Sequence, residues 1–183
     1  SSFAALVDAV HPIPVYEASD PSPVSRQIAE HVAELLPFDP TLQMGIGQVP
    51  EAITSLLTTD QIGVARFIGM GSDPMVDLFD TGVLSRSVVV PSPAVAAVEL
   101  LGTPKLFTAA EANPSIGVYP VTDVGDSCRL ADIPRFVSIN SAVEVDLTGQ
   151  CNSEVIGGRQ VAGVGGAMDF IEAGRASHGG LRI

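Results

Sequence analysis

Thr41-Leu-Gln-Met-Gly-Ile-Gly-Gln-Val-Pro-Glu-Ala-Ile53 is the stretch that decides the fold class. Thr41–Met44 is short and apolar, as in a buried strand, and Pro50 opens a helix that continues to Leu57. The glycine turn Gly45-Ile46-Gly47 between them directs backbone N–H groups at an anion or a carbonyl oxygen. A dinucleotide fingerprint needs a third glycine where Pro50 stands, so we exclude a Rossmann dinucleotide site.

Helical and strand-like segments alternate along the rest of the chain. A helix is expected at 24–36, with Ser22 as N-cap and Pro23 in the first position. Segment 136–147 alternates with period two, so it is expected to be one long strand. This alternation predicts an α/β domain over 24–183, with a mostly parallel sheet flanked by helices, after a proline-rich linker and lead-in at 1–23. Further strands are expected at 62–68, 87–90 and 116–119, helices at 94–101 and 105–112, and a short helix or a turn at 75–79.

The composition excludes several partners. Among 183 residues, 46% are hydrophobic and 16% charged, the net charge is −12, and Lys105 is the only lysine. Cations are therefore too few for nucleic acid or an anionic membrane surface. No apolar run is long enough to span a membrane, and the first residues lack the basic region of a signal peptide. Cys128 and Cys151 are expected to be reduced thiols of a cytoplasmic protein.

A second glycine-rich segment is Ile156-Gly-Gly-Arg-Gln-Val-Ala-Gly-Val-Gly-Gly-Ala-Met-Asp-Phe170. Glycine loses the most backbone freedom on folding, so it is favoured where φ is positive or where the backbone approaches another group closely. One interpretation is a series of tight turns between short strands. The other is a loop whose N–H groups face a ligand, with Asp169-Phe170 beginning the next helix.

Several stretches together resemble the acetyl-CoA hydrolase/transferase family, which includes 4-hydroxybutyrate and butyrate CoA-transferases. They are 41–53, Phe136-Val-Ser-Ile-Asn-Ser-Ala-Val-Glu-Val-Asp-Leu-Thr-Gly-Gln150, Ile156-Gly-Gly-Arg-Gln160 and Gly163-Val-Gly-Gly166 with Asp169-Phe170. The resemblance covers about 11–180. It implies a CoA-transferase-like fold and most of the C-terminal domain of a two-domain protein, cut at both ends.

The resemblance also implies a chemistry. In that family a glutamate carboxylate attacks an acyl-CoA thioester, giving an acyl and then a glutamyl-CoA intermediate. Backbone N–H groups of two glycine loops would stabilise the oxyanion; here these are Ile46 and Gly165-Gly166. Coenzyme A is then a substrate moiety, with no bound cofactor and no metal. The substrate-binding residues that the resemblance implies are Gly45, Gly47, Gln48, Asn140, Gly163 and Val164.

The family's nucleophile has no counterpart at the aligned position, which is Phe67. Asp73 is the nearest carboxylate that could replace it. Glu144 and Asp146 lie two apart on one strand face, either as solvated carboxylates or as an acid/base pair.

Two functions therefore stay open. The first is an enzyme that transfers CoA, or that cleaves a thioester or a C–C bond of a β-keto acyl-CoA, with an altered active site. The second is a non-catalytic subunit that keeps the fold. Both imply an acyl-CoA with a carboxylic acid acceptor, an oligomer, and an N-terminal domain or partner subunit of the same fold, because the apolar composition leaves little polar surface.

Overall fold

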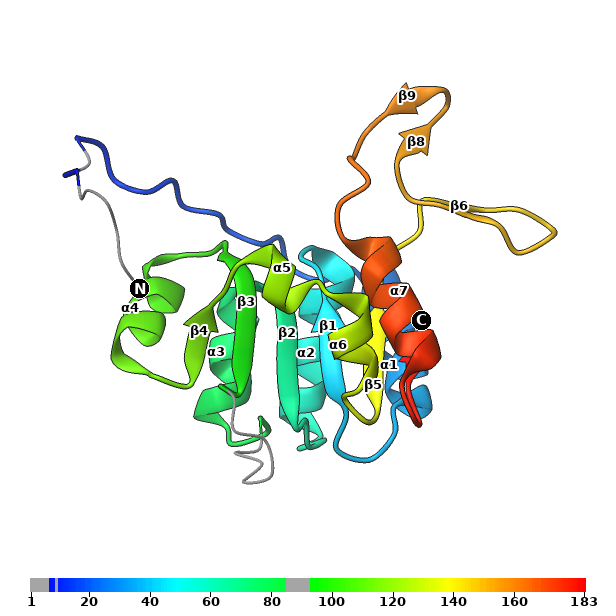
Figure 1. Ribbon diagram of the computed structural model, residues 1–183. Helices are drawn as coiled ribbons and strands as arrows, with labels where there is room; N and C mark the ends of the chain where they lie inside the picture. The colour runs from blue at the N-terminus through cyan, green and yellow to red at the C-terminus, as the bar shows by residue number, and fades with distance from the viewer. Residues whose placement is uncertain (1–6, 9, 85–92) are drawn as a thin grey trace.

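A six-stranded parallel sheet forms the centre of the computed structural model, which describes residues 7–8, 10–84 and 93–183 (Figure 1). Every strand pair in it is parallel. The expected strand at 87–90 lies outside the described residues. In spatial order the strands are β10 (Leu181–Arg182), β5 (Phe136–Ile139), β1 (Thr41–Met44), β2 (Arg66–Gly71), β3 (Val95–Leu100) and β4 (Ile116–Val118).

Helices cover both faces of this sheet, as the predicted α/β class requires (Figure 1). The helices α1 to α4 contact one another in sequence order, and α6 contacts α7. Two buried clusters result. The larger contains Leu42, Leu57 and Phe67, and the smaller contains Ile68 and Phe170. The helices are α1 (Pro23–Leu35), α2 (Gln48–Thr59), α3 (Asp73–Asp80), α4 (Pro104–Ala112), α5 (Val121–Val124), α6 (Ser127–Ala131) and α7 (Ala167–Ala176).

The start of α1 confirms the capping prediction. The Ser22 hydroxyl accepts a hydrogen bond from the Ser25 backbone N–H at 3.1 Å, and Pro23 occupies the first turn. Two apolar side chains of α1 face the solvent, since Val24 is 64% exposed and Leu35 58% exposed. The buried face instead consists of Ser25, Ala29 and Val32.

The helix expected at 94–101 is wrong, since Val95–Leu100 forms β3. Its alanines and leucines favour a helix in isolation. In the fold, however, Ala96 and Ala97 lie between β2 and β4, with one side chain in each buried cluster. Tertiary burial on both faces therefore decides the conformation.

The long strand expected at 136–147 is correct only for its first four residues, which form β5. After Asn140 the chain leaves the sheet and forms an arm of two small hairpins that extends away from the domain (Figure 1). Val145 is 64% exposed, and Leu147 is fully exposed. The alternation reflects this exposed arm, not a continued sheet strand. Its strands are β6 (Glu144–Val145), β7 (Cys151–Asn152), β8 (Val155–Ile156) and β9 (Arg159–Gln160).

The lead-in before α1 holds no helix or strand in its described part. It follows the domain surface, where the Tyr16 N–H donates to the Gly102 carbonyl oxygen at 3.1 Å. Among the described residues, no helix has both the length and the apolar character needed to cross a membrane.

Candidate active site

The strand order places a switch point between β1 and β5. From β1 the chain proceeds through β2, β3 and β4 on one side, and then crosses to β5 and β10 on the other. In open α/β sheets, ligands bind at such a point, beyond the carboxyl ends of the strands. A cavity of about 320 Å³ lies at this edge, lined by the ends of β1, β2 and β3, by Asn140 after β5, and by the start of α7.

The cavity brings together residues of both glycine-rich segments. Gly45 follows β1, and Gly165 and Gly166 lie more than a hundred residues later in the chain, yet all three line the same cavity. Gly165 has φ +56°, which favours glycine, and Gly166 is the N-cap of α7. Val164 and Asn140, also predicted, complete this side. We call this cavity the glycine pocket.

A buried polar chain supports the wall of the glycine pocket between β5 and β1. The Asn140 Nδ2 donates to the Ser138 hydroxyl at 2.8 Å, and that hydroxyl donates to the Gln43 Oε1 at 2.7 Å. Ser138 and Gln43 are both buried. The Ser138 hydroxyl both accepts from Asn140 and donates to Gln43, so this series of hydrogen bonds holds the Asn140 amide at the edge of the glycine pocket.

Four of the predicted residues lie outside the lining of the glycine pocket: Ile46, Gly47, Gln48 and Gly163. Gly47, with φ +111°, is the N-cap of α2. The Gln48 Oε1 accepts from the Ser25 hydroxyl of α1, and the Gln48 Nε2 donates to the Ser19 hydroxyl of the lead-in. Gln48 therefore joins the lead-in to α2.

Phe67 and Asp73 are also placed away from the glycine pocket. Phe67 is 3% exposed and packs in the larger cluster, where β2 pairs it with Leu42 and Val95. The Asp73 carboxylate accepts from the Thr103 N–H at 3.0 Å, the Thr103 hydroxyl at 2.9 Å and the Leu106 N–H at 3.2 Å. These hydrogen bonds connect α3 to the start of α4.

Glu144 and Asp146 belong to the exposed arm. The Asp146 carboxylate accepts from the N–H groups and side chains of Thr148 and Gln150. These hydrogen bonds lower the pKa of Asp146, and the bond from the Thr148 hydroxyl contributes most. Glu144 accepts instead from the Asn152 amide at 2.9 Å. The two carboxylates thus organise separate parts of the arm.

Sequence reasoning missed three polar or conformational features of the glycine pocket: Gln43, Gly69 and Glu99. Gly69, near the end of β2, has φ +122°, and a Cβ there would lie 3.0 Å from the Met44 carbonyl oxygen. Glu99 interrupts the apolar run of β3. A charged residue in an otherwise apolar strand indicates a position with a special role. Because the sequence predicts a helix at 94–101, Glu99 is not recognised as such a position.

Residues 102–183 match a family model described as the acetyl-CoA hydrolase/transferase C-terminal domain. The 4-hydroxybutyrate coenzyme A transferase of Clostridium kluyveri is 36% identical over 180 residues, which are 97% of this chain and 42% of that protein. Residues 102–183 are an acetyl-CoA hydrolase/transferase C-terminal domain. The chain spans about two fifths of the length of the curated relatives it matches.

Solved structures agree with this acetyl-CoA hydrolase/transferase assignment. RipA from Yersinia pestis has a TM-score of 0.80 and 29% identity, covering 94% of this chain and 39% of that one. A 4-hydroxybutyrate CoA-transferase from Porphyromonas gingivalis has a TM-score of 0.75 and 26% identity, covering 94% of this chain and 40% of that one. The chain therefore has the CoA-transferase fold.

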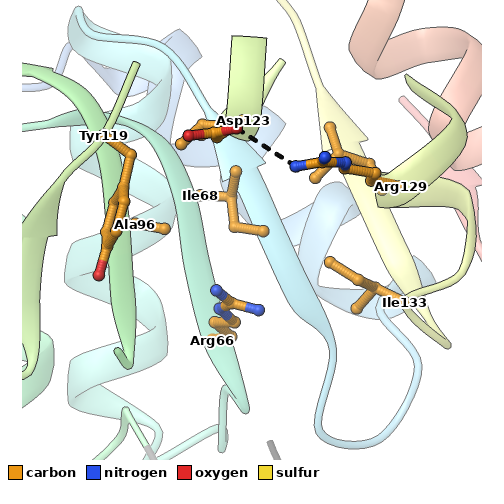
Figure 2. A pocket seen from close by; sticks show the side chains of 9 residues that line it. Arg66, Ile68, Ala96, Tyr119, Asp123, Arg129 and Ile133 are labelled. Atoms are coloured by element: carbon orange, nitrogen blue, oxygen red, sulfur yellow. Dashed lines mark hydrogen bonds and ion pairs between the residues drawn. The ribbon is translucent and has the colours of Figure 1, made fainter. Parts of the chain in front are cut away.

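A second cavity of about 320 Å³ lies on the face covered by α5 and α6 (Figure 2). Arg129 closes one side through an ion pair with Asp123 at 3.2 Å. Burial lowers the pKa of Arg66 at its other end, and nearby Tyr119 opposes this shift. None of the predicted site residues lines this cavity, so the glycine pocket is the candidate active site.

Glu51, in the first turn of α2, is the one acidic side chain of the described residues with a strongly raised pKa. Burial, together with the negative charges of Asp73 and Asp77, raises it from 4.5 to about 7. Glu51 lines neither cavity described above, but a separate one of about 340 Å³ beside Asp77. Its titration should therefore affect the stability of the domain.

Glu51→Gln is expected to raise the free energy of unfolding at pH 8 by about 1 kcal/mol, a value reduced for partial exposure. Between pH 4.5 and 7 the unfolded chain loses the proton and the folded chain keeps it, so wild-type stability falls as pH rises. Below pH 4.5 the two proteins should be equally stable. Urea unfolding below pH 4.5 and at pH 8 measures this, and an equal difference under both conditions would contradict it.

Proposed function

We propose that this chain binds an acyl-CoA thioester in the glycine pocket and transfers its CoA to a carboxylic acid. The observation that carries the proposal is the meeting of Gly45, Gly165 and Gly166 at the switch point of the sheet. The relatives' names, such as 4-hydroxybutyrate coenzyme A transferase, support this substrate class.

Backbone N–H groups of the two glycine loops are proposed as the oxyanion donors: those of Gly165 and Gly166, which line the pocket, and that of Ile46, which lies outside the lining but directly follows the pocket residue Gly45. A thioester oxygen gains negative charge when its carbonyl carbon is attacked, and preorganised N–H donors stabilise that charge without reorganising. Gly165 and Gly166 also stand at the N-terminus of α7, where the helix dipole favours a developing anion.

We also infer a partner domain or subunit that covers the arm. Val145, Ile156 and Val164 are each more than half exposed, although all three are apolar and belong to a segment outside the core. A surface of this kind is more common at protein interfaces than on free arms.

Acetyl-CoA with 4-hydroxybutyrate is the assay pair that tests the proposal. CoA transfer predicts 4-hydroxybutyryl-CoA and acetate, with no net release of free thiol. Free CoA without a new thioester would indicate hydrolysis instead. A protein that binds CoA esters without turning them over, alone or with a partner domain, would be the non-catalytic subunit and would overturn the proposal.

A further inference from the structure

A β-bulge turns Glu99 into the glycine pocket. In the pairing of β2 with β3, Gly69 pairs with Ala97 and Met70 with Glu99, so Val98 has no partner. Before the bulge, side chains alternate, with Ala96 in the smaller cluster and Ala97 in the larger. After it, the consecutive residues Val98 and Glu99 both line the pocket. Bulges often re-aim a side chain in this way beside active sites.

The Glu99 carboxylate is exposed within the pocket and is not engaged elsewhere. Among the described residues it takes part in no ion pair and no hydrogen bond. Asp73, by contrast, accepts three hydrogen bonds. An unengaged carboxylate keeps its lone pairs available for a ligand.

Neither of the other candidate positions at the pocket competes with Glu99. Gly69 carries no side chain, and its positive φ and its distance to the Met44 carbonyl disfavour one. Asp169, the other pocket carboxylate, lies in the first turn of α7, where its charge stabilises the helix. Acylation would neutralise that charge and remove the stabilisation, whereas Glu99 has no such role in β3.

From this arrangement we propose that Glu99 is the nucleophile of the glycine pocket, an assignment that rests on the proposed CoA transfer. A Glu99 oxygen attacks the thioester carbonyl carbon, the C–S bond breaks, and CoA leaves as a thiolate from a mixed anhydride. The thiolate then attacks the Glu99 carbonyl carbon, which releases the acyl group as a carboxylate and leaves a Glu99–CoA thioester. The acceptor carboxylate reverses both steps, so atoms and charge balance without another reactant.

Trapping with borohydride tests this assignment. The wild-type protein is incubated with acetyl-CoA, reduced, digested and examined by mass spectrometry, and Glu99 should be recovered as the corresponding alcohol. Glu99→Gln should show no reduced side chain and lose about 10³-fold or more in kcat, while its Kd for acetyl-CoA changes little. Glu99→Asp should retain part of the activity and carry the adduct at position 99.

Glu111→Gln, which makes the same charge change on the exposed surface of α4, is the matched control and should keep wild-type activity. An adduct on Asp169 or another carboxylate, or full transfer activity in Glu99→Gln, would overturn the assignment and leave CoA transfer standing. Absence of any transfer in the wild-type protein would overturn the proposed function together with it.

Discussion

Gly166→Val is expected to lower kcat/KM for CoA transfer by about a hundredfold or more, with the fold retained. Gly166 lines the glycine pocket and has φ −96°, which lies outside the left-handed region that favours glycine. An added Cβ would first meet the ring of Phe170, at 3.1 Å from Cε2, and that ring also lines the pocket. The new side chain should therefore shift the Phe170 ring slightly and occupy space in the pocket intended for the thioester.

Steady-state kinetics with acetyl-CoA and 4-hydroxybutyrate measure the effect, and circular dichroism reports on the fold. Gly63→Val is the control, because Gly63 lies outside the pocket, has no heavy atom within 4 Å of an added Cβ and has no positive φ. A folded Gly166→Val protein with wild-type kcat/KM would show that this loop does not contact the thioester.

The parts of the fold predicted correctly depend on local chemistry. The Ser22 cap and Pro23 define the start of α1, and Thr41–Met44 with its glycine turn defines β1 and the start of α2. The errors depend on tertiary context. Val95–Leu100 becomes a strand because β2 and β4 pair with it, which no local pattern in those residues specifies.

The sequence predicts the glycine residues of the candidate site. It does not predict the residues whose orientation depends on the register of a strand. The pocket positions of Gly45, Gly165 and Gly166 follow the two glycine-rich segments. Glu99 depends on a bulge that skips Val98, and a one-residue change of register moves a side chain to the other face of a strand. Phe67 illustrates the converse, because its strand position points into the larger cluster.

Gly174→Ala is expected to lower the free energy of unfolding by about 1–3 kcal/mol, although alanine is the better helix former. Gly174 lies within α7 where the helix contacts β10. An added Cβ would collide with the Leu181 carbonyl oxygen and lie 3.2 Å from the Leu181 carbonyl carbon. A Cβ on Gly180 would in turn lie 2.5 Å from the Gly174 carbonyl oxygen, so the two backbones interlock. Both obstacles are backbone atoms, which cannot move aside as a side chain can.

Urea unfolding of Gly174→Ala and Gly63→Ala separates close contact from backbone entropy. Gly63→Ala removes the same unfolded-state freedom without a collision, so its stability should be unchanged or slightly raised. A Gly174→Ala protein as stable as Gly63→Ala would contradict the interlocked packing. Because α7 carries Gly166 at its N-terminus, a helix displaced from β10 would also displace one wall of the glycine pocket. Affinity for acetyl-CoA should therefore fall together with stability in Gly174→Ala, whereas Gly166→Val should lower activity alone.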